Sequence, residues 1–178
     1  MTHEMYIARA SDESVAARGD HGGVVTALLQ FALKNGMVDA VLCVKARDGN
    51  RYDGVAAYIT EWERVADCAG VLHTATPNIP RVIKEYLNGA KDIKLAVVCK
   101  PCDARAIIEL AKREQIEREN LILIGVNCTG TMRPETARKM YREVFNVNPE
   151  EVVKEDIDAG KITVTLADGS VVEHDLLE

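Results

Sequence analysis

Two cysteines lie where a predicted strand meets a predicted helix. Residues 97–113 read VVCKPCDARAIIELAKR, so that Lys100 and Pro101 separate Cys99 from Cys102. A thiol at the start of a helix feels the positive end of the helix dipole, which favours the thiolate that attacks disulfides or binds metal. This spacing leaves three interpretations open: two small buried residues at a strand end, a redox couple, or ligands of a metal or cluster.

A third cysteine, Cys128, follows the next predicted strand along the chain. Parallel strands bring their carboxyl ends, and the helix starts that follow them, to one edge of a sheet where ligands bind. We therefore expect Cys102 and Cys128 to lie near each other at that edge. The sequence holds no second CxxC segment, and we interpret Cys43 and Cys68 as structural residues of a strand and a helix.

Two other segments hold residue types that suit a cofactor. The run Asp20-His21-Gly22-Gly23 precedes a helical pattern, and glycines let backbone amides approach an anion such as a phosphate. Two glycines before a helix also suit an ordinary tight turn. His73, Thr74, Thr76 and Asn78 form a polar loop that offers contacts to a cofactor but needs none to exist. The sequence has no Ser-His-Asp order, paired-carboxylate signature, Walker loop or GxGxxG segment.

The elements that must position these residues follow from the hydrophobic pattern. Two consecutive strand-loop-helix units, with strands over 93–98 and 121–126, predict buried strands of a parallel sheet that helices cover. Upstream, we expect a strand over 6–10, a helix over 24–34, a hairpin of 38–44 with 52–60, and helices over 61–68 and 79–87. The helices after the two buried strands are expected over 103–112 and 134–145. The side chains expected to face inward are Val25, Leu28, Leu29, Ala32, Ala104, Ile107, Ile108, Ala111, Ala137, Met140, Tyr141, Val144 and Phe145.

The last part of the chain has a different pattern. Turn signals at Ala159-Gly160 and Asp168-Gly169 predict two or three polar antiparallel strands. We therefore predict the α/β fold class, with a parallel or mixed sheet covered by helices and a small antiparallel C-terminal β appendage. The predicted organisation is an α/β domain over 1–148 and a short β appendage over 149–178.

Composition excludes several classes of protein. The 178 residues suit one domain of ordinary size, and a formal charge of −6 argues against nucleic-acid binding, which needs a concentrated basic surface. No apolar run approaches the roughly 18 residues of a membrane span, and the N-terminus lacks a signal-peptide pattern. We therefore expect a cytoplasmic protein. Five cysteines, an odd number, favour free thiols or metal ligands over a disulfide framework.

Three stretches together resemble one protein family. They read GDHGGVVTALLQFAL from residue 19, AAYITEWERVADCAGVLHTATPN from residue 56, and KPCDARAIIELAKR with LILIGVNCTGTMRP from residues 100 and 121. They are similar to the beta subunits of the coenzyme F420 hydrogenase/dehydrogenase family, and most of all to those of coenzyme F420-dependent formate dehydrogenases. The resemblance runs from about Met5 to the tail strands.

The resemblance implies an electron-transfer flavoprotein subunit, or a fragment of one. In such proteins a bound FAD exchanges a hydride with coenzyme F420, and iron-sulfur clusters carry single electrons to or from a catalytic alpha subunit of a formate dehydrogenase or hydrogenase. FAD suits this task because it accepts two electrons together and releases them singly. The flavin needs no protein nucleophile, so no catalytic acid or base is named. Residues 1–148 then become the flavin- and F420-interacting domain.

The family's motifs carry over to particular residues. The implied flavin contacts are Gly22, Gly23, Thr26, Thr74, Thr76 and Asn78. Cys102 and Cys128 match family cysteines and are the implied ligands of a 4Fe-4S cluster, which normally takes four thiolates, so the set is incomplete here. Family members continue into a cysteine-rich segment, which makes 149–178 the expected start of a truncated C-terminal region. The residues alone also permit a thiol-redox or zinc-binding module that uses Cys99, Cys102 and Cys128.

Overall fold

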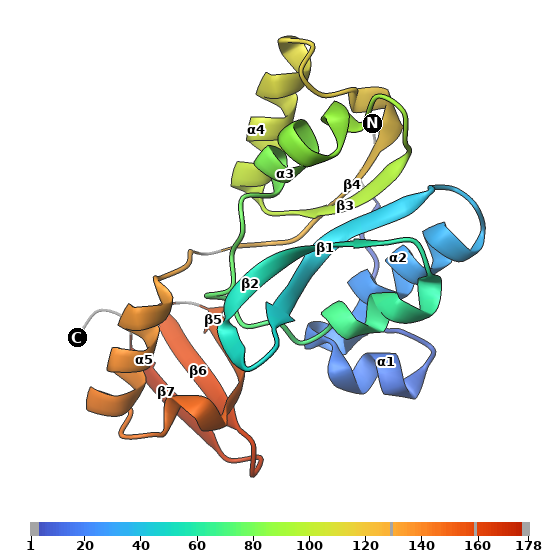
Figure 1. The fold of residues 1–178 in the computed structure, drawn as a ribbon. Coiled ribbons are helices and arrows are strands. Elements are labelled where there is room, and N and C mark those ends of the chain that lie inside the picture. Colours follow the sequence, from blue (N-terminus) through green and yellow to red (C-terminus); the bar gives the residue numbers. More distant parts are fainter. Residues whose placement is uncertain (1–3, 129, 159, 176–178) are drawn as a thin grey trace.

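The described residues of the chain form two β-sheets with helices packed around them (Figure 1). The structure is a computed structural model, and it describes residues 4–128, 130–158 and 160–175. The large sheet has the strand order β2-β1-β3-β4, and the small sheet has the order β5-β6-β7. The strands are β1 Ala40–Arg47, β2 Asn50–Ile59, β3 Leu95–Cys99, β4 Leu121–Gly125, β5 Val152–Asp158, β6 Lys161–Leu166 and β7 Val171–Asp175.

The helices occupy the segments between these strands. Residues Asp20–Gly23 form a short 3-10 turn directly before α2, and Trp62–Cys68 form a longer 3-10 helix. None of the helices among the described residues has the length and apolar character that crossing a bilayer requires. The α-helices are α1 Glu13–Arg18, α2 Val24–Lys34, α3 Ile79–Tyr86, α4 Pro101–Lys112 and α5 Pro134–Glu143, and further 3-10 turns cover Asn88–Ala90, Arg118–Asn120 and Pro149–Glu151.

The large sheet is mixed, which confirms the predicted fold class. β1 and β2 form an antiparallel hairpin, while β3 pairs in parallel with both β1 and β4. Successive side chains of a strand point to opposite faces, so neighbouring residues enter different cores. Leu42 and Val97 pack with helices α3 and α4, whereas Val41 and Ala96 pack with α2 on the other face. Figure 1 shows these helices on opposite sides of the sheet.

The small sheet forms its own core with α5. The buried side chains of this core come from α5, from β5 and β6, and also from β2 and the loop after it. Tyr52 on β2 is one of them, and its hydroxyl donates to the Pro149 carbonyl at 2.8 Å. The buried members are Tyr52, Leu72, Ala137, Tyr141, Phe145, Val152, Ile162, Val164 and Leu166.

This arrangement corrects the expectation that α5 covers the parallel sheet, because α5 lies against the small sheet instead (Figure 1). The tail strands are also not polar on both faces. In β6 the buried residues alternate with partly or fully exposed ones, as expected for an antiparallel sheet with one packed face. The predicted boundary between residues 148 and 149 falls between α5 and the strands on which it packs. The predicted turn residue Ala159 lies outside the described residues.

Some predictions of local structure are wrong. Residues 4–10 form no strand: no strand pairs with them, and Ala10 N–H donates to the Gly22 carbonyl at 2.9 Å. β4 was expected to be buried, but it is an edge strand, and Ile122 is 39% exposed. Leu28, Ile108 and Val144 were expected inside, yet each is about half exposed. Leu28 and Ile108 lie at the margin of the apolar stripe of α2 and α4, and Val144 follows the last residue of α5.

Candidate functional site

A cavity of about 440 Å³ opens between three segments of the chain. β2 forms one wall, the loop 72–78 forms the second, and the loop that leads into α5 forms the third. Binding pockets for small molecules typically measure about 300–1,000 Å³. We call this cavity the threonine pocket, and its lining residues are Tyr52, Asp53, Gly54, Thr74, Thr76, Pro77, Thr131, Met132, Arg133 and Pro134.

Contacts from three elements hold the loop of the threonine pocket. On β2, a Cβ built at Gly54 would lie 2.6 Å from the Ala75 carbonyl oxygen, so the two backbones touch directly. The Thr131 hydroxyl donates to the His73 carbonyl at 2.9 Å. The backbone N–H and the hydroxyl of Thr74 donate to Oε2 of Glu155 at 3.2 and 3.4 Å. Three consecutive loop residues are therefore held from three sides.

Glu155 is a buried carboxylate that belongs to β5. Its residue is 6% exposed, and its Oε1 accepts a hydrogen bond from the Tyr141 hydroxyl at 2.6 Å. Burial and the Glu155 charge raise the pKa of Tyr141. Burial together with the charges of Glu155 and Glu150 also raises the pKa of Tyr52. The sequence does not indicate that Glu155 is buried, because acidic residues in a strand of polar pattern are normally exposed.

The residues predicted to contact a flavin do not all meet at one cavity. Thr74 and Thr76 line the threonine pocket, whereas Gly22, Gly23 and Thr26 do not. Asn78 caps α3, because its Oδ1 accepts the Arg81 N–H at 3.0 Å. Of the two segments that the resemblance indicates, the loop with Thr74 and Thr76 lines the pocket, and the turn with Gly22 and Gly23 does not.

The backbone conformation of the turn before α2 explains why it contains two glycines. Gly22 and Gly23 adopt φ angles of 81° and 69°, which favour glycine, and a Cβ at Gly23 would lie 2.4 Å from the Val15 carbonyl oxygen. Close packing against α1 therefore requires glycine at residue 23. No side chain caps the first turn of α2, and backbone amides at such a helix start can bind an anion. Thr26 is buried in that turn.

Cys102 and Cys128 lie beyond the carboxyl ends of paired parallel strands. β3 and β4 pair with Cys99 opposite Gly125, and each of the two cysteines follows its strand by the same three positions. The helix begins at Pro101, earlier than predicted, so Cys102 belongs to its first turn. The Asp103 carboxylate accepts the Lys100 N–H at 3.1 Å and fixes this helix start. Cys102 is exposed and Cys128 is partly buried.

Cys99 has different surroundings. It is buried, and its thiol donates to the Ile124 carbonyl at 3.8 Å. Burial and the nearby Asp103 carboxylate raise the pKa of this thiol. Within residues 4–128, 130–158 and 160–175, no three His, Cys, Asp or Glu side chains are grouped so that they could hold a metal ion. The alternative zinc set of Cys99, Cys102 and Cys128 is therefore not assembled, and the alternative module has no support.

Cys43 and Cys68 meet in the core, which the sequence did not indicate. Cys43 is buried in the cluster beneath α2, and Cys68 packs against that cluster. A hydrogen bond to Cys68, together with burial, raises the pKa of the Cys43 thiol. This apolar setting agrees with the interpretation of both cysteines as structural residues.

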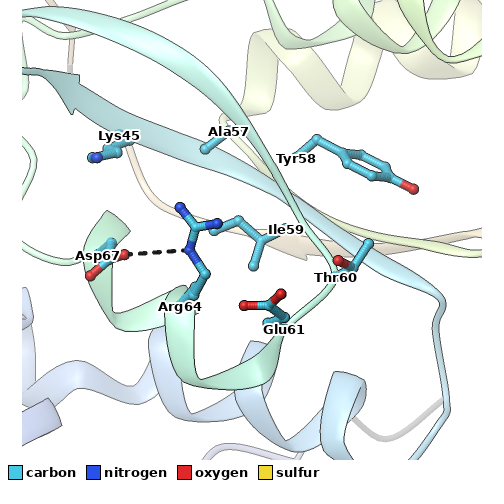
Figure 2. A pocket seen from close by; sticks show the side chains of 8 residues that line it. All are labelled: Lys45, Ala57, Tyr58, Ile59, Thr60, Glu61, Arg64 and Asp67. Carbon is cyan, nitrogen blue, oxygen red and sulfur yellow. Dashed lines mark ion pairs between the residues drawn. The ribbon is translucent and has the colours of Figure 1, made fainter.

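A second cavity is much smaller and lies beside the 3-10 helix after β2 (Figure 2). Its volume is about 120 Å³, well below the usual size of a cofactor pocket. Figure 2 shows Arg64 turned toward Asp67, at 4.0 Å between Nε and Oδ2. Arg64 and Asp67 pair within the cavity and Lys45 pairs with Asp48 outside it, so we assign this small cavity no ligand. Its lining residues are Lys45, Ala57, Tyr58, Ile59, Thr60, Glu61, Arg64 and Asp67.

Two family models together match most of the chain. Residues 5–84 match "Coenzyme F420 hydrogenase/dehydrogenase, beta subunit N-term", and residues 92–178 match the model of the same beta subunit's C terminus. The chain is 45% identical over 179 residues to the beta subunit of F420-dependent formate dehydrogenase 1 from Methanococcus maripaludis. It is also 45% identical over 161 residues to an F420-dependent formate dehydrogenase beta subunit from Methanocaldococcus jannaschii.

These alignments cover 99% and 90% of this chain but 45% and 41% of the two relatives, so the chain spans less than half of their length. A solved structure of the F420-reducing [NiFe] hydrogenase complex from Methanosarcina barkeri contains a chain of the same fold. The TM-score is 0.76 at 20% identity, with 94% of this chain and 58% of that chain covered.

Proposed function

Because the chain belongs to the coenzyme F420 hydrogenase/dehydrogenase beta-subunit family, we propose that it binds FAD in the threonine pocket and passes electrons between coenzyme F420 and a partner enzyme. The observation that carries the proposal is the position of the loop 72–78. Thr74 and Thr76, which the resemblance implies as flavin contacts, line the larger of the two cavities described above. The partner is the catalytic alpha subunit of a formate dehydrogenase or hydrogenase.

The lining of the threonine pocket fits a flavin ring. Pro77 and Met132 are partly exposed and offer apolar surface for the ring faces. The Thr76 hydroxyl can donate to the polar edge of the ring, the Thr131 hydroxyl can accept because its proton goes to the His73 carbonyl, and Arg133 offers a positive charge. When bound, FAD would supply the conversion between one hydride, which carries two electrons, and two single-electron transfers.

The remaining assignments are proposals of the same kind. The uncapped start of α2 at Gly22, Gly23 and Thr26 suits the phosphate end of the cofactor. Cys102 and Cys128 offer two of the four thiolates of a 4Fe-4S cluster. The described residues do not fit a complete cluster, so no electron step within this chain is derived through one. The division at residue 148 and the cytoplasmic location also stay predictions.

Titration of the 178-residue chain with FAD tests the proposal. We expect the flavin fluorescence to fall on binding, because the ring leaves water and contacts Pro77 and Met132. Thr76→Val should raise the Kd by about tenfold, which corresponds to about 1.4 kcal/mol, the size of one hydrogen bond to the flavin. Thr60→Val is the matched control, because Thr60 is also exposed but lines the smaller cavity. A chain that leaves FAD fluorescence unchanged, or equal Kd values for both variants, would contradict the proposal.

A further inference from the structure

A carboxylate of the small sheet connects two walls of the threonine pocket. Oε2 of Glu155 accepts both hydrogen bonds from Thr74, which belongs to the loop wall. Oε1 accepts the bond from Tyr141 on α5, and the third wall is the loop that leads into this helix. Glu155 itself does not line the pocket. One buried side chain therefore fixes the loop wall and the helix behind the third wall at the same time.

The chemistry of this contact requires two acceptor oxygens. The three donors are a backbone amide, a hydroxyl and a phenol, and both carboxylate oxygens of Glu155 are occupied by them. A glutamine side chain has one acceptor oxygen and one NH₂ donor, so it cannot accept from both sides. With its oxygen toward Thr74, its NH₂ could donate to the Tyr141 hydroxyl oxygen only if the phenol O–H turned away and lost its acceptor. A buried donor left without a partner is costly, because it no longer contacts water either.

A bulge in β5 brings Glu155 to this position. Val152 pairs with Leu166 but Lys154 pairs with Thr165, so the register shifts at Val153. The shift changes the alternation of side chains, and Glu155 joins Val152 on the buried face of the strand. Regular alternation from Val152 would expose residue 155. Bulges commonly redirect one side chain near a functional site.

We propose that Glu155 is a positioning residue that holds the loop 72–78 and α5 in the arrangement that forms the threonine pocket. The small sheet thereby sets the affinity of a pocket to which it contributes no lining residue. The inference rests on the proposed function, because it takes FAD as the ligand of the pocket.

The test compares FAD binding and the visible circular dichroism of bound flavin for the wild-type chain and Glu155→Gln. We expect Glu155→Gln to raise the Kd by about tenfold or more, as for loss of a charge-assisted hydrogen bond. The flavin bands of its saturated complex should also change shape, because the loop contacts the ring differently. A role in folding alone would lower the melting temperature but leave these bands unchanged. Asp156→Asn, the exposed neighbour on the same strand, is the matched control and should behave as wild type.

A further variant keeps the test decisive. Tyr141→Phe removes one donor but keeps the buried ring, and it should shift the Kd in the same direction by a smaller factor. If Glu155→Gln does not fold, Tyr141→Phe decides. Failure of the wild-type chain to bind FAD overturns the proposed function and this inference together. Wild-type binding with an unchanged Kd and unchanged flavin bands in Glu155→Gln, or in Tyr141→Phe where that variant decides, overturns this inference alone.

Discussion

Gly54→Ala is expected to weaken FAD binding by more than about tenfold and to destabilise the fold by about 1–3 kcal/mol. The added Cβ would lie 2.6 Å from the carbonyl oxygen and 2.7 Å from the carbonyl carbon of Ala75. Both are backbone atoms, so the loop 72–78 must move, and with it Thr74 and Thr76 in the pocket wall. Isothermal titration with FAD and urea denaturation would measure the two effects.

Gly125→Ala provides a matched control for this prediction. Gly125 is also a strand glycine, but a Cβ built there meets nothing within 4 Å. The substitution should therefore leave the FAD affinity and the free energy of unfolding near wild-type values. If both variants bind FAD equally well, the loop contact at Gly54 does not shape the pocket.

Tyr141→Ala is expected to lower the free energy of unfolding by about 4 kcal/mol, as for other large-to-small changes of buried aromatic residues. The side chain is fully buried between the small sheet and Tyr52, and its ring lies edge-on to Phe145 with centroids 5.4 Å apart. Its loss also leaves Oε1 of Glu155 without the hydroxyl donor. Urea denaturation followed by circular dichroism would measure the change.

Val144→Ala is the comparison for this core prediction. Val144 follows the same helix and was expected inside from the pattern, but it is 51% exposed. Its truncation should therefore change the free energy of unfolding by less than about 0.5 kcal/mol. Similar losses for both variants would mean that α5 packs through a different face.

The order of strands and helices could be predicted because local patterns determine it. The run from Leu95 to Val98 is continuously apolar, and the helical spacing of Ala104, Ile107 and Ala111 follows it, so a parallel unit was recognisable. The hairpin followed from Asp48-Gly49 between two apolar runs. These features depend on residues that are close in sequence.

Features that depend on distant contacts could not be predicted. The apolar stripe of α5 fits any sheet, and nothing in it indicates packing on the small sheet rather than the large one. The burial of Glu155 follows from a bulge at Val153, and the amino-acid sequence of β5 does not indicate this bulge. Ile122 is partly exposed because β4 is an edge strand, and strand order was not available from the sequence.

The residues of the candidate site also fall into those that could be predicted from the sequence and those that could not. Thr74 and Thr76 were named from the resemblance, and both line the pocket. Gly54, Thr131 and Glu155 were missed, because each acts through a contact with a loop that is more than twenty residues away in the sequence. The sequence offered one indication of the role of Gly54, since a glycine inside a strand often marks a close approach of two backbones.

A crystal structure of the 178-residue chain with FAD would test the central claim most directly. The account predicts electron density for the isoalloxazine ring in the threonine pocket, in contact with Thr76 on one wall and Met132 on another. Flavin density at any other place on the chain, with the threonine pocket filled only by solvent, would contradict it.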